Sequence, residues 1–184
     1  MKNLSNFCLI LIFVFKFSFL AAYSSDPKSF ISELVTDAIE KLSSTSLSKE
    51  EKIQFISEVA LNNVDIKALG LYTLGELRKS SDKQIIENYQ QAFEKYFLKN
   101  LTSRLTDYSS NKFEIIGADK KSANYTIVKT KIAQSEKQPE VKIDWRVYTK
   151  NPEKPLVRDL IVEGLSLART QKEEFASILN SNDG

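Results

Sequence analysis

The spacing of apolar residues changes once along this chain, near Tyr108, and this change constrains the fold more than any other feature. Before Tyr108, apolar side chains recur every three or four residues, which is the spacing of an amphipathic helix. After it they recur at every second residue, the spacing of a half-buried strand. A chain with its helices first and its strands after them is expected to fold as α+β. We therefore expect a helical N-terminal half packed on a four-stranded antiparallel sheet, with the sheet curled around the longest helix.

Residues that cap helices predict where the first three helices begin. Asp26, which is followed by proline, is suited to cap the first helix. Ser48 and Glu51 have the spacing of a capping box, so a second helix is expected to begin between them. Asp65 is expected to cap a short third helix that ends at Gly75, because glycine accepts the left-handed conformation common at helix ends.

The strongest periodic segment follows a second capping-box pattern, Ser81–Gln84, and predicts a helix about seven turns long. The simpler interpretation is that the apolar stripe of this helix packs against the sheet as ordinary hydrophobic core. The functional interpretation is that helix and sheet stand slightly apart, so that the stripe lines a cavity for an apolar ligand. Periodicity does not separate the two, because both need the same faces. The stripe consists of Ile85, Tyr89, Phe93, Phe97, Leu101, Leu105 and Tyr108.

Four strands are expected in the second half of the chain, and Val141–Val147 is the clearest of them. Its residues alternate between apolar and polar at every position, so the odd-numbered side chains are expected to face the core. Residues 113–116, 123–132 and 156–167 supply the other three strands. A last helix over residues 171–180 is expected to bury Phe175, Ile178 and Leu179.

The first 24 residues are expected to be a signal peptide. Lys2 precedes the apolar run Phe7–Phe15, and Ala22 and Ser24 place small side chains at positions −3 and −1 of a cleavage site. The alternative is an uncleaved anchor, but Lys16 interrupts the run before the roughly 20 apolar residues that a spanning helix needs. The chain is thus divided into a signal peptide, residues 1–24, and one domain, residues 25–184, with its helical part at about 25–110 and its sheet part at about 111–184.

Composition excludes most enzymatic and metal sites. The chain has no histidine, and its one cysteine, Cys8, lies in the predicted leader, so Ser/His/Asp, Cys/His and zinc sites are excluded. Without Lys2 and Lys16 the mature chain has 24 basic and 24 acidic residues, which gives no electrostatic reason to bind nucleic acid. We expect no catalytic residue, no metal and no cofactor.

Carboxylates are the chemistry that these exclusions leave open. Asp144 and Glu163 would form an acid–base pair if they were neighbours across the sheet, and an enzyme of this kind is one alternative function. The preferred interpretation is a solvated edge or a salt bridge with Arg146 or Arg158. Arg158 and Asp159 are expected to form a structural ion pair at the start of a strand.

Several segments together resemble one known family. In the helical half they are Val64–Asp65, Leu74–Gly75 and the residues Gln84, Phe93, Phe97 and Leu101; in the second half they are Val141–Tyr148, Arg158–Leu167 and Gln171–Leu179. In this order they look like the MlaC family of periplasmic phospholipid-binding proteins, also called the toluene-tolerance auxiliary family. The segment Arg158–Leu167 is similar to the family pattern D-x-x-(V/I)-E-G-(V/I)-S-L. The resemblance covers nearly all of residues 28–180.

The resemblance implies a fold similar to nuclear-transport-factor-2-like domains with a helical extension, and a pocket that takes acyl chains inward. It also implies a monomeric carrier with bound phospholipid as its cargo. Such a carrier ferries lipid across the periplasm between an outer-membrane lipoprotein–porin complex and an inner-membrane ABC transporter. The residues expected to line the pocket are Leu74, Tyr89, Phe93, Phe97, Leu101, Ile143, Trp145, Val147, Ile161 and Leu165.

A second alternative function is a periplasmic interaction or chaperone module of the same fold without a lipid ligand.

Four cations are candidates to contact a lipid phosphate or the acidic rim of a partner. The other interpretation is that they lie on a solvated surface. These cations are Lys150, Lys154, Arg158 and Arg169.

Overall fold

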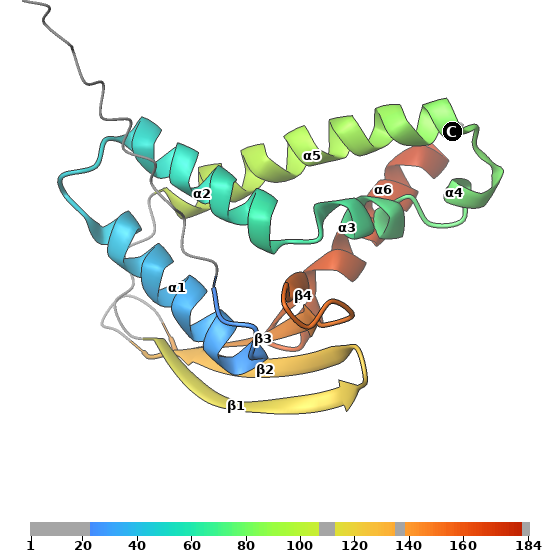
Figure 1. The fold of residues 1–184 in the computed structure, drawn as a ribbon. Coiled ribbons are helices and arrows are strands. Elements are labelled where there is room, and N and C mark those ends of the chain that lie inside the picture. Colours follow the sequence, from blue (N-terminus) through green and yellow to red (C-terminus); the bar gives the residue numbers. More distant parts are fainter. Residues whose placement is uncertain (1–22, 107–112, 135–138, 182–184) are drawn as a thin grey trace, which may run out of the picture.

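The computed structural model describes residues 23–106, 113–134 and 139–181. Five helices precede the strands: α1 (Pro27–Ser43), α2 (Lys49–Asn63), α3 (Ile66–Thr73), α4 (Leu77–Ser80) and α5 (Lys83–Leu105). The strands are β1 (Phe113–Ser122), β2 (Tyr125–Ile132), β3 (Val141–Tyr148), β4 (Leu156–Val162) and β5 (Leu165–Ser166), and α6 (Leu167–Ser181) follows them. Figure 1 shows α1 lying against the sheet, with α2, α3 and α5 farther from it. The predicted α+β architecture is confirmed.

The sheet is antiparallel, with its strands in the order β1-β2-β3-β4-β5. It has one strand more than expected, because the segment 156–167 is not a single strand. Glu163 and Gly164 both have positive φ, 48° and 84°, and such a pair forms the tight turn that reverses a hairpin. The chain therefore turns back at these two residues, and the short β5 pairs with the end of β4.

The side-chain caps predicted for the first three helices are present. Asp26 accepts a hydrogen bond from the backbone N–H of Ser29 at 2.9 Å, and Asp65 accepts one from that of Ala68 at 3.1 Å. Ser48 forms the full capping box. The prediction of a second capping box at Ser81–Gln84 is wrong. The cap residue of α5 is Asp82, and it makes no side-chain cap hydrogen bond.

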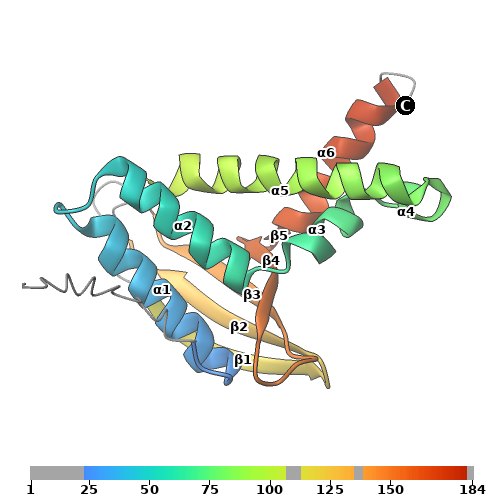
Figure 2. The same ribbon diagram turned by 45° about the horizontal axis from the view of Figure 1, so that its top comes forward.

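The helix that packs on the sheet is α1. Phe30 and Ile31 on α1 are buried in one cluster with Val128, Val147 and Val157 from three strands. The long helix α5 packs instead against α2 and α3, and its contacts with the strands are sparse. Figures 1 and 2, which differ by a rotation of 45°, both show α5 running along the layer of α2 and α3. The expectation that the sheet curls around the long helix is therefore corrected.

Helices α3 and α5 approach closely at Gly70. A Cβ atom at this position would lie 2.7 Å from Oε1 of Gln90 and 3.0 Å from Cδ1 of Phe93. A larger residue at this position would therefore have to displace the end of the Gln90 side chain and shift the Phe93 ring.

Helix α6 is amphipathic, but its apolar face is only partly covered. Phe175 packs edge-on against Phe93 and Tyr96 of α5, with ring centroids 6.3 and 5.4 Å apart. Leu179 is 36% exposed and Ile178 is 59% exposed, so the predicted burial of these two residues is wrong. Figure 2 shows why: α6 crosses α5 and its last turns extend past it.

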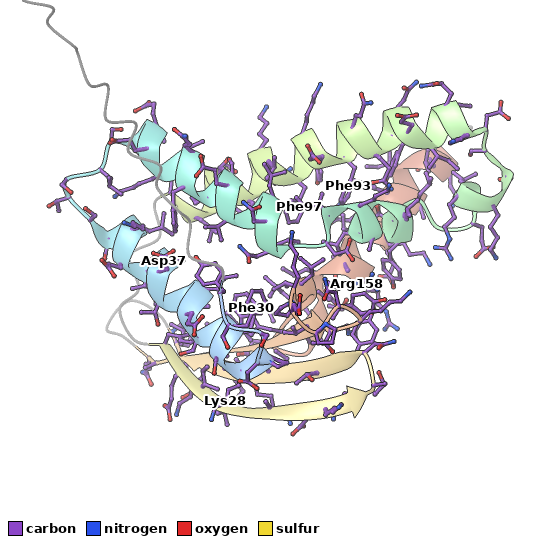
Figure 3. All side chains as sticks on the ribbon, viewed as in Figure 1. Lys28, Phe30, Asp37, Phe93, Phe97 and Arg158 are labelled. Carbon is purple, nitrogen blue, oxygen red and sulfur yellow. The ribbon has the colours of Figure 1, made fainter. Side chains whose placement is uncertain are left out.

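Arg158 joins the helical layer to the sheet. Its Nε and Nη2 atoms each lie 2.7 Å from Oδ2 of Asp65, the residue that caps α3. Its Nη1 donates to the hydroxyl of Tyr125 at 2.8 Å, and the guanidinium lies 3.3 Å from the ring centroid of Tyr148. Figure 3 shows Arg158 between α3 and the sheet. The planar guanidinium satisfies a carboxylate and two aromatic partners at once.

The predicted ion pair between Arg158 and Asp159 is wrong. Consecutive residues of a strand point to opposite faces of the sheet, so neighbours in sequence rarely pair. Asp159 instead faces Arg146 on the adjacent strand, at 3.5 Å.

The predicted signal peptide and Tyr108 lie outside the described residues, except that Tyr23 and Ser24 are described. Tyr23 packs its ring edge-on against Phe30, with centroids 6.2 Å apart, and its hydroxyl donates to Asp37 at 2.6 Å. Burial and the nearby Asp37 raise the pKa of Tyr23 well above its ordinary value. Over the ranges that the structure describes, no helix is both long and apolar enough to cross a bilayer.

We predict that Arg158→Met lowers the free energy of unfolding by about 2 kcal/mol, because it leaves Asp65 charged, mostly buried and without its partner. Urea unfolding measures this change. Lys79→Met is the matched control, since it breaks the exposed Lys79–Glu76 pair and should cost less than about 1 kcal/mol. Equal losses in the two variants would show that Arg158 does not join the layers.

Candidate functional site

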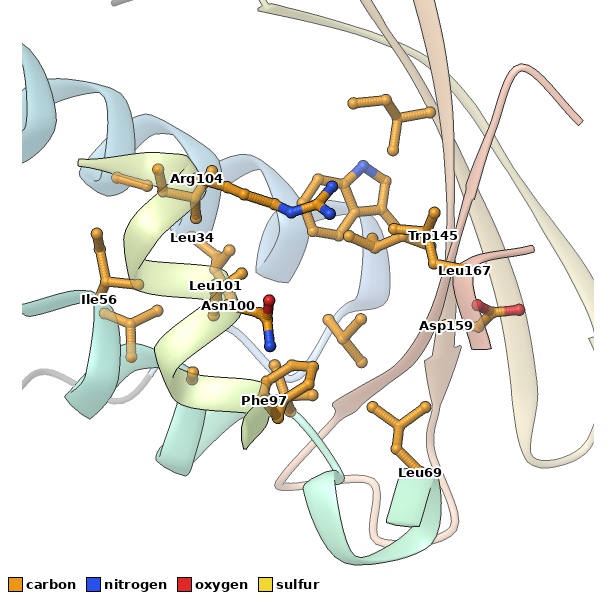
Figure 4. Close-up of a pocket in the computed structure, with 18 of the residues that line it drawn as sticks. Leu34, Ile56, Leu69, Phe97, Asn100, Leu101, Arg104, Trp145, Asp159 and Leu167 are labelled. Carbon is orange, nitrogen blue, oxygen red and sulfur yellow. The ribbon is translucent and has the colours of Figure 1, made fainter. Parts of the chain in front are cut away.

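An apolar cavity of about 620 Å³ lies between α5 and the sheet. This volume falls within the range of roughly 300–1,000 Å³ that is typical of ligand-binding pockets. Figure 4 shows side chains of α5 on one side of the cavity and Trp145 of β3 on the other. Its apolar wall consists of Leu34, Val35, Ala38, Ile39, Leu42, Phe55, Ile56, Val59, Ala60, Val64, Leu69, Phe93, Tyr96, Phe97, Leu101, Leu105, Phe113, Ile132, Ile143, Trp145, Val157, Leu160, Leu167 and Ala168.

The aromatic residues of α5 form one side of this cavity. Phe93 stacks on Phe97 and on Tyr89, with ring centroids 6.2 and 6.1 Å apart. Phe93 is buried where α5 crosses α3, whereas Phe97 and Leu101 are half-buried beyond the crossing. Because α5 is held by α2 and α3 and not by the strands, these two side chains face the cavity without filling it.

Trp145 forms the opposite side with its one polar atom already satisfied. The indole N–H donates to the hydroxyl of Thr130 at 3.0 Å, and that hydroxyl donates to the carbonyl of Ile143 at 2.8 Å. Thr130 is fully buried. The hydrogen bond fixes the indole in place, so the ring presents only carbon to the cavity.

Most polar groups in the wall have partners of their own. Thr73 bonds the carbonyl of Gly70 at 2.9 Å and the hydroxyl of Tyr89 at 2.8 Å. Gln171 accepts from the hydroxyl of Tyr96 at 3.1 Å and donates to Glu174 at 3.0 Å. The cavity therefore offers a guest few groups for hydrogen bonding along its length.

Asp159, the buried carboxylate in the wall, has a structural role. It accepts hydrogen bonds from the hydroxyl of Ser166 at 2.7 Å and from the backbone N–H of Ala168 at 3.0 Å, at the start of α6. With Arg146 also beside it, this carboxylate holds the start of α6 on the sheet.

The other candidate acids do not form a pair. Asp144 lies opposite Ile161 on β4, and Glu163 accepts a hydrogen bond from the backbone N–H of Lys142. The acid–base arrangement that Asp144 and Glu163 would need is therefore not formed.

The structure brings five of the ten sequence-predicted site residues to the cavity wall: Phe93, Phe97, Leu101, Ile143 and Trp145. The other five lie elsewhere. Leu74 is the C-cap residue of α3, and Tyr89 is turned to Thr73, where burial raises its pKa above the ordinary value. Val147 is fully buried in the core beneath α1, and Leu165 is 69% exposed in β5.

Ile161 faces the opposite side of the sheet. There it lines an open depression of about 730 Å³ together with Lys129, Asp144 and Arg146. Apart from Ile127 and Ile161 this depression is lined by charged and polar side chains, so it lacks the apolar wall expected of a pocket for acyl chains.

Many of the pocket residues that sequence reasoning missed come from α1 and α2, such as Leu34, Leu42, Ile56 and Val59. Their helical periodicity was visible, but it indicates only that a residue faces inward. Arg104, a charged residue of the cavity wall, was also missed. Lys150, Lys154, Arg158 and Arg169, the four cations considered as phosphate contacts, are not part of that wall.

Comparisons with known proteins give one family and one described fold relative. Residues 32–184 match the model of the MlaC protein family. The solved structure of the phospholipid-binding protein from Ralstonia solanacearum, in complex with a phospholipid, superposes with a TM-score of 0.65 at 16% identity. The match covers 85% of this chain and 89% of that one. A comparison with curated proteins finds no match.

We predict that Thr130→Val lowers the free energy of unfolding by about 1–3 kcal/mol, because it leaves the indole N–H of Trp145 without an acceptor. The midpoint of urea unfolding measures this loss. Thr126→Val is the matched control on the same strand, since the Thr126 hydroxyl makes no hydrogen bond among the described residues, and it should change stability much less. If both variants lose the same stability, the indole does not depend on Thr130.

Proposed function

The chain belongs to the MlaC family, and from this premise we propose that it carries phospholipid with the acyl chains enclosed in the cavity beneath α5. The observation that carries the proposal is the apolar cavity itself, which lies between the long helix and the sheet with little internal polarity. The fold relative from Ralstonia solanacearum, crystallised with a phospholipid, supports it.

The physical requirement for such a carrier is a dry volume for the lipid tails. Burial of each methylene group is worth about 0.8 kcal/mol, so a diacyl lipid with roughly 30 of them would lose more than about 20 kcal/mol on entering water. A protein that takes lipid from a membrane has to offset this cost with apolar contact. The aromatic and aliphatic wall of the cavity supplies that contact without any need for hydrogen bonds.

Five side chains are proposed to contact the acyl chains directly: Phe93, Phe97, Leu101, Ile143 and Trp145. Three come from α5 and two from β3, so that the lipid would lie between the helix and the sheet with its headgroup towards solvent. Residues of α1 and α2 would form the closed end of the pocket.

The family consists of lipid carriers and not of enzymes. For this chain the proposed role is transport across the periplasm, from one membrane-bound Mla-type complex to another. The partners would be an outer-membrane lipoprotein–porin complex and an inner-membrane ABC transporter. The proposed role requires export, which agrees with the leader expected from the sequence.

The contacts of Tyr23 favour a cleavage site for that leader other than the one expected from the sequence. Its ring packs on Phe30 and its hydroxyl donates to Asp37, so it behaves as part of the folded domain. Cleavage after Ser24 would remove these contacts. Cleavage after Ala22 would keep them and leave a small residue at position −1, with Leu20 at position −3. We therefore place the start of the mature domain at Tyr23.

Expression of the full chain in a Gram-negative host tests this processing. The intact mass and N-terminal sequence of the periplasmic protein should show Tyr23 as the first residue, because Ala22 would be the last residue removed. A mature chain that begins at Ser25 would contradict the revised site and support the one expected from the sequence.

The carrier function is tested by solvent extraction of the purified protein, followed by mass spectrometry of the extract. Wild-type protein should contain phospholipid or accept it from vesicles. Phe97→Asp should lower the amount bound at least about tenfold, because a charge in the cavity is costly beside acyl chains. Ile85→Asp is the matched control: it lies on the same helix, is 56% exposed and is not part of the wall, so it should keep its lipid.

Circular dichroism establishes that both variants are folded. A wild-type protein that is free of lipid and also refuses added phospholipid would contradict the carrier function. Equal binding by Phe97→Asp and Ile85→Asp would show that the lipid lies elsewhere.

A further inference from the structure

Arg104 stands apart from the other polar groups of the cavity wall. It lies in the last turn of α5, and its side chain is solvent-exposed while it also lines the cavity. Within the described ranges its side chain makes no hydrogen bond and no ion pair. Figure 4 shows the Arg104 side chain extending from α5 across the cavity towards Trp145.

The carboxylates of the wall are engaged with other groups. Asp159 is held by Ser166, by the start of α6 and by Arg146. Glu174 accepts a hydrogen bond from Gln171. Among the described residues, none takes up the donors of the Arg104 guanidinium, which is a permanent positive charge next to an apolar volume.

A phospholipid has the complementary arrangement of groups. Its two acyl chains need apolar volume, and its phosphate, which is joined to them through glycerol, needs hydrogen-bond donors and positive charge. Arginine presents several N–H donors in a planar fork that matches phosphate oxygens, and it stays charged at every physiological pH.

We propose that Arg104 binds the phosphate of the lipid whose acyl chains occupy the cavity. This inference rests on the proposed carrier function and adds a selectivity to it. The protein would discriminate phospholipids from neutral lipids with the same acyl chains. It would not discriminate among headgroups beyond the phosphate, because the contact is made to the group that they share.

Asn100 lies one turn before Arg104 on the same face of α5, and it also lines the cavity. Its side-chain amide donates to the carbonyl of Tyr96 at 2.8 Å, and this amide carries no charge. The cation for the phosphate is thus supplied by one residue, which makes the proposal testable with a single substitution.

The test is a competition for lipids in one preparation of vesicles. The vesicles contain equal parts of phosphatidylglycerol, phosphatidylcholine and diacylglycerol, all with palmitoyl and oleoyl chains. Lipid-free protein is incubated with them and re-isolated, and its bound lipids are quantified by mass spectrometry. The variants are Arg104→Gln, Arg104→Lys and the matched control Lys99→Gln, which removes an exposed charge from α5 outside the cavity wall.

Wild-type protein should enrich both phospholipids over diacylglycerol by about tenfold, the effect of one charge-assisted hydrogen-bonded contact. Arg104→Gln should lose that enrichment and still bind lipid, Arg104→Lys should keep part of it, and Lys99→Gln should match wild type. Enrichment that survives in Arg104→Gln, or wild-type protein that takes up all three lipids equally, overturns the role of Arg104 and leaves the carrier function intact. Wild-type protein that takes up no lipid overturns both.

Free phosphate is a second source of the same chemistry, and calorimetry distinguishes it. Lipid-free wild-type protein and Arg104→Gln are each titrated with inorganic phosphate. Weak or absent binding of free phosphate, together with lipid enrichment that depends on Arg104, supports the lipid headgroup as the ligand. Tight binding of free phosphate that requires Arg104, without any effect on lipid enrichment, assigns the site to the free ion and overturns the proposal.

Discussion

The contact between Arg158 and Asp65 determines how the helical layer is held over the sheet. Asp65 caps α3 and Arg158 belongs to β4, so the pair fixes α3 to one edge of the sheet, next to the bridge between Val64 and Val157. Helix α5 is in turn held by α3 at the close crossing allowed by Gly70. On the other side, α1 lies directly on the strands. Helix α5 is thus supported by other helices, and the space between it and β3 stays open as the cavity.

Sequence reasoning predicted the elements well, because their signals are local. The caps at Asp26, Ser48 and Asp65 and the alternation in β3 depend on neighbouring residues only, and the structure contains them. The division between core and cavity depends on distances between layers, which periodicity does not contain. Ile143 and Val147 illustrate this. Both lie on the inner face of β3, yet Val147 packs in the core with α1 and Ile143 lines the cavity.

Polar partners were the least predictable part of the site. The partner of Arg158 lies 93 residues away, in the turn between two helices, whereas the adjacent Asp159 faces another strand.

The predicted burial of Ile178 was wrong because an apolar helical face does not show how far its packing partner reaches. Helix α6 extends beyond the helix that it crosses. Arg104 gave no local signal either, since a cation in the last turn of a helix is ordinary. Its significance comes from the cavity that it faces.

The proposed carrier function requires that acyl chains lie in the cavity. Trp145 allows a direct measurement because it is the one tryptophan of the chain. Its indole forms part of the wall and is held by Thr130. Phosphatidylcholine with brominated acyl chains quenches tryptophan fluorescence only at short range. The account predicts strong quenching of Trp145 when this lipid is bound, and little quenching when the same lipid without bromine is bound. Stoichiometric binding of the brominated lipid with unchanged Trp145 fluorescence would contradict it.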